Sequence, residues 1–279
     1  MRIERDVSLS KLTTFRMGGV AKTFLVPETE NELYELIKMR SLPRYLIGGG
    51  SNLLINDQRE FEEVISLREF NNKITNLGGG RFYVGASCRL QVLINEINDI
   101  GYGGIEYLYS VPGLVGGAIV MNAGRGNSID ELGNYIQSVR CIVNGEITEL
   151  THDECNFTKR SSIFKNSEMV VLGAVFTFKS GKPEEFKLLR EERIALVKKV
   201  QDNSHPNFGS VFYKSDRRIM KIVKLFSMKK GGVYFSRKTL NWLLNDGGSF
   251  NEAIQQINKV KLVHSLFMRA CVPEVIIWE

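Results

Sequence analysis

The sequence has few residues of the kinds that bind metals, form disulfides or cross membranes. Its four cysteines form no CxxC pair, and together with three histidines they show no metal-ligand spacing, so we expect no metal site. No apolar run reaches about 18 residues, the length of a membrane span. The N-terminal stretch has no apolar signal core. We therefore expect no membrane partner and, by default, a reduced cytoplasmic setting.

Proline is also scarce, with six residues against 26 glycines, which indicates tight turns rather than stiff linkers. The 279 residues exceed what one compact core usually needs, and 43% hydrophobic with 24% charged residues is typical of a globular protein. A net charge of +6 suits an anionic small ligand or a nucleic acid equally well. Because the basic residues are dispersed and no nucleic-acid motif is present, we expect no nucleic-acid partner.

The order of apolar and amphipathic stretches predicts an α+β fold, because it lacks the regular βα alternation of a doubly wound sheet. Strands are predicted at 21–27, 44–47, 53–55, 62–66, 81–86, 138–143, 146–150, 169–178, 209–213 and 274–278. Helices are predicted from 29 onward, with Leu33, Leu36 and Ile37 on one face, over 89–99, 184–200, 216–226 and 237–245, and from 249 onward. Two of these helices begin with a capping box, formed by Thr29 with Glu32 and by Ser249 with Glu252.

Two glycine-rich loops are candidate phosphate-binding elements. In the first, GGGSN at 48–52, glycine permits the backbone concavities in which N–H groups converge on an anion. It is neither a Walker loop nor a dinucleotide fingerprint, and a plain turn between strands explains it equally well. The second, PGLVGGA at 112–118, joins a constrained turn to a small-residue stretch that could open a helix toward an anion, and MNAG at 121–124 follows it.

Seven motifs carry a resemblance to a known family, and they occur in order over almost the whole chain. They are TTFRMGG (13–19), YLIGGGSNLLI (45–55), GIEYLYSVPGLVGGAIVMNAG (104–124), FTKRSSIF (157–164), GSVF (209–212), the glycines, serine and asparagine between 231 and 245, and PEV (273–275). This order closely resembles UDP-N-acetylenolpyruvoylglucosamine reductase, in particular the shorter type of that enzyme, with some divergence on the substrate side.

The resemblance implies an FAD-binding fold of the vanillyl-alcohol-oxidase kind. Two subdomains, at 1–57 and 58–195, would surround the flavin, and an α+β domain at 196–279 would bind substrate, with its last strand able to return to the flavin site. It also implies reduction of the enolpyruvyl ether of a UDP-sugar by NADPH, giving UDP-N-acetylmuramate for peptidoglycan. The implied enzyme is a monomer whose partner is that small molecule. Because no histidine or cysteine lies in or beside either loop, we expect the FAD to be held non-covalently.

The same matching implies roles for individual residues. Arg160 would stabilise the developing enolate, Ser210 would donate a proton to C2, and Glu274 would assist that proton transfer. The implied cofactor-binding residues are Gly48, Gly49, Gly50, Ser51, Asn52, Pro112, Gly113, Val115, Gly116, Gly117, Ala118, Asn122 and Gly124. The implied substrate-binding residues are Lys159, Tyr213, Lys214 and Asn241.

The chain departs from the family pattern on the substrate side. The family usually has tyrosine where Lys159 stands, and segments 213–215 and 233–239 also differ from it. Two alternatives therefore stay open. One is a paralogous flavin reductase acting on a different nucleotide sugar, and the other is a non-catalytic flavin-binding protein.

Overall fold

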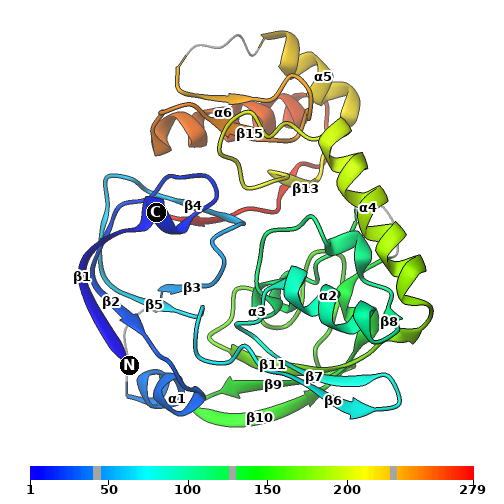
Figure 1. The fold of residues 1–279 in the computed structure, drawn as a ribbon. Coiled ribbons are helices and arrows are strands. Elements are labelled where there is room, and N and C mark those ends of the chain that lie inside the picture. The colour runs from blue at the N-terminus through cyan, green and yellow to red at the C-terminus, as the bar shows by residue number, and fades with distance from the viewer. Residues whose placement is uncertain (40–44, 126–129, 227–230) are drawn as a thin grey trace. The chain divides into compact units, whose positions relative to one another are not determined.

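The computed structural model describes residues 1–39, 45–125, 130–226 and 231–279, and Figure 1 shows the course of the chain. It divides into two compact units that each draw on separate stretches of sequence. The first unit comprises residues 1–4, 24–49 and 63–197, and the second comprises 5–23, 50–62 and 198–279. The division expected from the sequence, at 57/58 and 195/196, remains a prediction.

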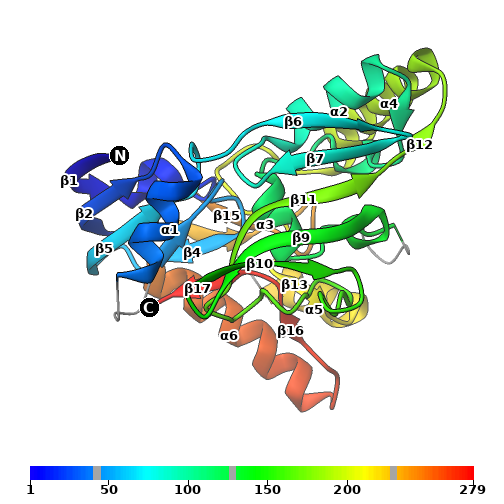
Figure 2. The same cartoon turned by 90° about the horizontal axis from the view of Figure 1, so that it is seen from below.

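The first unit is built on a five-stranded antiparallel sheet with the strand order β10-β9-β11-β7-β6, whose strands run side by side in Figure 2. Its strands are β6 (Ile74–Gly78), β7 (Arg81–Gly85), β9 (Ile136–Val143), β10 (Glu146–Thr151) and β11 (Val170–Thr177). The short helix α3 (Val115–Val120) packs against β7 and β11. Helix α2 (Leu90–Asp99) buries the stripe predicted for it, Leu90, Leu93, Ile94 and Ile97, in the same core.

A second, four-stranded sheet has the order β1-β2-β5-β3. Its strands are β1 (Arg2–Ser8), β2 (Val20–Val26), β3 (Tyr45–Ile47) and β5 (Glu60–Ser66). Strand β3 pairs in parallel with β5 from Tyr45 opposite Val64 to Ile47 opposite Ser66. Residue 44, the first of the strand predicted here, lies outside the described residues. The smaller elements of the first unit are β8 (Tyr102–Gly103), β12 (Lys179–Ser180), η2 (Glu106–Leu108) and η3 (Leu132–Tyr135).

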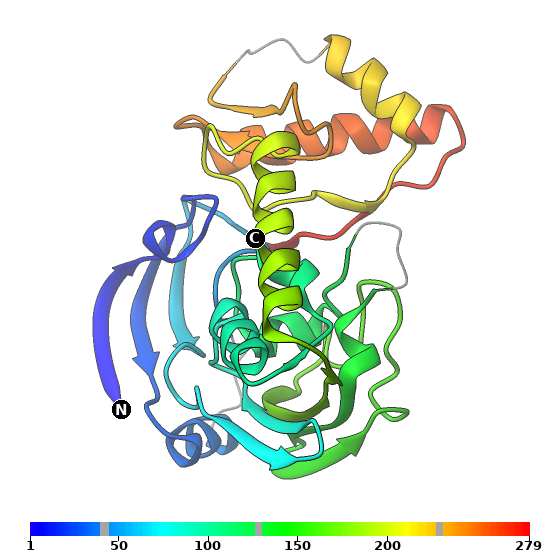
Figure 3. The ribbon, with the colours of Figure 1, turned by 45° about the vertical axis from the view of Figure 1, so that its right-hand side comes forward.

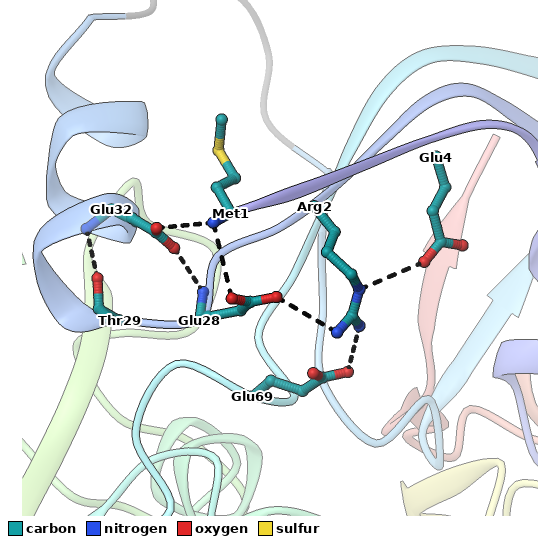
Figure 4. Close-up of polar contacts among 7 residues, drawn as sticks. All are labelled: Met1, Arg2, Glu4, Glu28, Thr29, Glu32 and Glu69. Carbon is teal, nitrogen blue, oxygen red and sulfur yellow. Dashed lines mark hydrogen bonds and ion pairs between the residues drawn. The ribbon is translucent and has the colours of Figure 1, made fainter.

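Helix α1 (Glu30–Lys38) is capped differently from the prediction (Figure 4). Thr29 Oγ1 accepts a hydrogen bond from the Glu32 N–H at 3.2 Å, as a capping box requires. The Glu32 carboxylate does not return to Thr29; it accepts from the Glu28 N–H at 2.8 Å and pairs with the Met1 amine at 2.7 Å. This carboxylate raises the pKa of the amine. The expected capping box is therefore only half formed, because the Glu28 N–H and the Met1 amine bind the two oxygens of Glu32.

The second unit combines short two-stranded sheets with two helices (Figure 3). Strand β4 (Leu53–Ile55) pairs in parallel with β17 (Ile276–Trp278), β13 (Phe212–Lys214) pairs with β16 (Val272–Pro273), and β14 (Val233–Phe235) pairs with β15 (Leu243–Asn245). Helix α5 (Arg217–Phe226) packs on α6 (Phe250–Leu266). The 3-10 helix η1 (Leu9–Leu12) completes the unit, and helix α4 (Pro183–Val200) ends in it.

Helix α6 forms as its sequence predicts. Ser249 and Glu252 make a complete capping box at its N-terminus, and Ala253, Ile257 and Val260 are buried. Near its other end the buried His264 donates from Nδ1 to the Val260 carbonyl, so that its Nε2 accepts the Asp216 N–H at 2.9 Å. This imidazole ties the start of α5 to the end of α6.

The helix predicted at 237–245 is wrong. Leu243–Asn245 form β15 instead, with Asn245 opposite Val233 in a β-hairpin. Leu243 and Leu244 are both fully buried, and a short apolar run of this kind is consistent with either a strand or a buried helix segment. Pairing with β14 decides between the two. The Asn245 amide also donates to the Phe15 carbonyl at 2.8 Å, which fixes the end of the strand.

No helix within residues 1–39, 45–125, 130–226 and 231–279 is both long and apolar enough to cross a membrane.

Replacement of Gly50 by alanine should destabilise the second unit strongly. Gly50 has a φ of +66°, and a Cβ on it would overlap the Leu12 carbonyl oxygen. We expect Gly50→Ala to lower the free energy of unfolding by about 2–5 kcal/mol, since left-handed strain adds to a clash with backbone. Gly247→Ala in the same unit is the control, because Gly247 has a φ of +80° and open space around it. It should cost only about 1 kcal/mol. Equal losses in urea unfolding would contradict the steric argument.

Candidate functional site

The two glycine loops meet in the first unit although about 64 residues separate them in sequence. A Cβ on Gly49 would lie 3.1 Å from the Gly113 Cα, and one on Gly48 would lie 3.6 Å from Leu114 Cδ1. Main chain therefore packs directly on main chain, which only glycines allow at such close approach. The sequence predicted two separate loops, and within the first unit Gly48 and Gly49 of the first loop lie against the second.

Helix α3 is anchored to the end of strand β7 by its first N–H groups. Val115 N–H donates to the Cys88 carbonyl at 2.8 Å, and Gly116 N–H donates to the Ala86 carbonyl at 2.9 Å. A Cβ on Gly116 would lie 2.9 Å from Ala86 Cβ, so this glycine allows the helix to pack closely. The anion site expected at this helix N-terminus thus cannot use these two N–H groups. Gly117 is different: it is exposed, and a Cβ there would meet nothing within 4 Å.

Arg68 is a residue beside the loops that the sequence analysis missed. It directly follows the β5 region, is half-buried, and its Nε donates to the Gly48 carbonyl at 2.8 Å. Burial lowers the pKa of the guanidinium, and the nearby positive charge of Arg89 lowers it further. Two like charges near each other are stabilised by an anion. Its neighbours in the sequence gave no signal that sets it apart from a surface arginine.

Asn122 organises the residues that follow α3. Its side chain is 1% exposed and its backbone is left-handed, with a φ of +40°. The amide nitrogen donates to the Glu131 carboxylate at 2.8 Å and to the Thr158 carbonyl at 2.9 Å, and the amide oxygen accepts the Gly133 N–H at 2.8 Å. Both ends of the amide therefore bond to protein groups. The contact of Asn122 with the cofactor remains a prediction. Its side chain has a structural role as well, because these hydrogen bonds join three segments.

Arg160 lies in the turn that Asn122 holds. Thr158 and Ser161 exchange two main-chain hydrogen bonds of 2.9 and 3.0 Å, and the turn between them carries Lys159 and Arg160. Arg160 has a φ of +58°, a conformation that costs a residue with a side chain about 1–2 kcal/mol. Lys165 Nζ donates to the Arg160 carbonyl at 3.2 Å. Lys159 is exposed on the same turn.

Tyr107 is a second candidate that sequence reasoning did not single out. Its hydroxyl is buried and has no hydrogen-bond partner among the residues that the structure describes. Burial raises the pKa of this phenol, whereas the positive charge of Arg160 acts in the opposite direction. An unpaired buried hydroxyl in the segment that leads to the second glycine loop is the kind of group that a bound ligand satisfies.

The second unit brings together Ser210 and Glu274, two of the three predicted catalytic residues. Glu274 N–H donates at 2.7 Å to the carbonyl of Val211, the residue that follows Ser210. Asn52 of the first loop joins them, because its amide donates to the Glu274 carbonyl at 3.1 Å and its own carbonyl accepts the Ile276 N–H at 3.0 Å. Ser210 and Glu274 are both half-buried. Hydrogen bonds thus join three segments that are distant in sequence, at residues 52, 211 and 274–276.

The predicted substrate residues of the second unit lie on and beside β13. Tyr213 is half-buried and Lys214 is exposed. The side chain of Asn241 is engaged with main chain: its amide donates to the Phe212 carbonyl at 2.6 Å and accepts the Phe212 N–H at 3.1 Å. Asn241 therefore fixes the strand that follows Ser210, and its contact with substrate stays a prediction.

Outside the gaps at 40–44, 126–129 and 227–230, no group of three or more histidine, cysteine or acidic side chains could hold a metal ion.

Comparison with known proteins shows where this arrangement recurs. Residues 21–151 match the family described as FAD binding domain. The UDP-N-acetylenolpyruvoylglucosamine reductase of Carboxydothermus hydrogenoformans is 33% identical over 266 residues, which cover 91% of this chain and 86% of that protein. The reductase of the same name from Parasynechococcus marenigrum is 30% identical over 290 residues, which cover 99% of this chain and 95% of that protein. The crystal structure of UDP-N-acetylenolpyruvylglucosamine reductase from Thermus caldophilus matches with a TM-score of 0.83 at 26% identity, over 100% of both chains.

The fold and the joined glycine loops define a flavoprotein oxidoreductase with an FAD-binding, vanillyl-alcohol-oxidase-like α+β fold. Within that class, the chain belongs to the UDP-N-acetylenolpyruvoylglucosamine reductase family. The residues present fit FAD at α3, where Gly117 is exposed and a Cβ on it would meet nothing within 4 Å.

Gly117→Ala should separate cofactor binding from folding. Because the added methyl group meets no protein atom within 4 Å and alanine favours a helix, the flavin-free protein should keep its thermal stability. If FAD covers this face, the methyl group should weaken FAD affinity by about tenfold or more, which corresponds to at least about 1.4 kcal/mol. Titration of the flavin-free protein with FAD, followed by quenching of flavin fluorescence, measures this. Gly145→Ala, in an open hairpin turn of the same unit, is the control. Unchanged affinity would show that the ligand does not face Gly117.

Asn122→Ala should be markedly more destabilising than loss of a single hydrogen bond. It leaves the buried Gly133 N–H and the Thr158 carbonyl without their partner, so we expect a loss of about 2–4 kcal/mol in the free energy of unfolding. Ser162→Ala is the control, because it removes one hydrogen bond of 2.8 Å to the Val120 carbonyl between the same two regions. It should cost about 1 kcal/mol. Comparable losses in thermal unfolding would show that Asn122 is not the organising residue.

Proposed function

We propose that this protein reduces the enolpyruvyl ether of UDP-N-acetylglucosamine to UDP-N-acetylmuramate, with NADPH as electron donor and FAD as cofactor, in peptidoglycan biosynthesis. Two observations support the proposal. A main-chain hydrogen bond of 2.7 Å from Glu274 to Val211 joins the segments that carry Ser210 and Glu274. Relatives 33% and 30% identical over most of this chain bear the name of this reductase.

The reaction adds a hydride to C3 of the double bond and a proton to C2. FAD, when bound, supplies the hydride chemistry. Negative charge then develops at C2 and on the adjacent carboxylate, so the protein must supply positive charge at the carboxylate and a proton at C2. These two requirements are met by different kinds of side chain.

Arg160 is the proposed source of positive charge. A guanidinium remains protonated at any physiological pH and offers a planar pair of donors that matches a carboxylate. Its main chain is fixed by the Thr158–Ser161 turn and, through Thr158, by the buried Asn122 amide. A fixed donor stabilises developing charge without having to reorganise during the reaction.

Ser210 is the proposed proton donor and Glu274 its assistant. A serine hydroxyl is a weak acid, but an enolate is a strong base, so transfer from Ser210 Oγ to C2 is feasible when the two are held in place. The Glu274 carboxylate would orient the hydroxyl or a water that returns a proton to it. Asn52 holds the Glu274 main chain and Asn241 holds that of Phe212, while the Glu274 N–H joins the two segments at the Val211 carbonyl.

The remaining features of the proposal follow from the resemblance. Lys159, Lys214 and Tyr213 would contact the UDP-sugar, and Lys and Arg side chains suit its diphosphate. We propose a monomer with a small-molecule partner and non-covalent FAD. The departures from the family pattern at Lys159, 213–215 and 233–239 make substrate identity the point to test first.

Ser210→Ala should separate the two half-reactions. Because NADPH reduces the flavin without a proton on C2, that step should keep its rate, whereas reoxidation by the enolpyruvyl ether should slow by about three orders of magnitude. Stopped-flow absorbance of the flavin measures both steps. Ser265→Ala removes an exposed hydroxyl from α6 of the same unit and should change neither.

Equal slowing of both half-reactions in Ser210→Ala would refute the proton-donor role. A wild-type protein that is reduced by NADPH but reoxidised only by a different unsaturated nucleotide sugar would identify the paralogous reductase instead. A protein that binds FAD but is reduced by no nicotinamide would be the non-catalytic flavoprotein.

A further inference from the structure

The C-terminal end of α6 exposes a cluster of large apolar side chains. We call Leu262, Leu266, Phe267 and Met268 the α6 tip. Their exposed fractions are 62%, 73%, 55% and 93%. Leu262 and Leu266 are four residues apart and so share one face of the helix. Figure 2 shows this end of α6 projecting away from β16, the strand that follows it. Within the second unit, then, an apolar surface faces solvent where the chain turns back.

Met268 holds an unfavourable backbone conformation at this tip. Its N–H donates to the Ser265 carbonyl at 2.9 Å, and the Arg269 N–H donates to the His264 carbonyl at 2.9 Å. This is a Schellman C-cap, in which the residue at the Met268 position is left-handed and usually glycine. Met268 has a φ of +50° and is almost wholly exposed. Neither the helix end nor internal packing accounts for a methionine here.

Positive charge surrounds the tip. Lys259, Lys261 and Arg269 flank it on α6 and just beyond, and all three are exposed. Helix α5, which packs on α6, adds the exposed Arg217, Arg218 and Lys221. Between residues 216 and 274 the sequence has eleven lysines and arginines and four acidic residues, one of which, Asp216, pairs with Arg269 at 3.9 Å. The second unit as a whole has 19 basic and 10 acidic residues, against 18 and 21 in the first, so the net positive charge of the chain lies in the second unit.

The basic and apolar side chains together indicate which kind of partner this surface binds. A nucleic acid would explain the basic residues but not four exposed apolar side chains at a helix end. A second copy of this chain would bring a like-charged surface against this one, which is unfavourable. An anionic lipid surface suits both features, since basic side chains are attracted to its headgroups and apolar side chains enter the acyl boundary.

We propose that the α6 tip and its surrounding lysines and arginines attach this protein peripherally to an anionic membrane. The sequence alone led us to expect no membrane partner, an expectation that rested on spans and signal segments rather than on surface docking. The attachment does not depend on the reaction proposed above, because no residue assigned to that reaction belongs to the tip.

The test is flotation of the purified FAD-loaded protein with vesicles of phosphatidylcholine alone or with one third phosphatidylglycerol. We expect binding to the anionic vesicles only, weakened by high salt. Lys259→Glu combined with Lys261→Glu should weaken partitioning by about 25-fold or more, at about fivefold for each lysine removed. Phe267→Ser combined with Met268→Gly should weaken it by about tenfold or more.

Met268→Gly alone gives the sharpest discrimination. It relieves the left-handed strain, so it should leave the melting temperature unchanged or raise it, while it weakens vesicle binding. The matched control is Leu188→Ser with Leu189→Ser on α4, which removes two side chains that are 55% and 46% exposed and should leave binding unchanged. All variants should keep wild-type flavin content.

Three outcomes would overturn the proposal. The first is that wild-type protein fails to float with the anionic vesicles, and the second is that the α6 tip variants bind as well as wild type. The third is a concentration-dependent dimer, seen by sedimentation velocity and abolished by the α6 tip substitutions, which would assign this surface to a second copy of the chain.

Discussion

The buried amide of Asn122 is the interaction on which the first unit's site depends. It links the end of α3, the segment at Glu131 and Gly133, and the Thr158 turn, which are far apart in sequence. A buried amide satisfied at both ends specifies one arrangement of its partners, because any other leaves polar groups unpaired. The end of helix α3 and the turn that carries Arg160 are thereby held by the same amide.

The sequence predicted those elements whose stability is local. The α6 capping box and the stripes of α2 and α6 need only neighbours within four residues, and all were confirmed. Elsewhere other groups compete with the local pattern. At Thr29 the Glu28 N–H and the Met1 amine bind the carboxylate that the box required, and at 237–245 pairing with β14 forms a strand where a helix was expected. The local pattern of residues indicates neither interaction.

In the candidate site too, the sequence predicted local features but not the contacts between distant segments. The family motifs marked the residue types, but not that Gly49 would pack on Gly113 or that Glu274 would bond beside Ser210. Arg68 was missed because nothing in its immediate neighbours distinguishes it from a surface arginine, whereas its hydrogen bond to Gly48 comes from strand β5 running beside β3. The left-handed backbone of Arg160 is likewise set by a turn closed from both sides.

The parallel pairing of β4 with β17 has a consequence for how the protein forms. Leu53–Ile55 pair with Ile276–Trp278, and the Asn56 N–H donates to the Trp278 carbonyl at 2.9 Å. During synthesis, the early strand must wait without its partner until more than two hundred further residues have left the ribosome. Contacts of such long separation slow folding because loop closure precedes any gain from pairing. The strand edge of β4 is meanwhile open to wrong partners, so this is the stage at which the nascent chain is most vulnerable to aggregation.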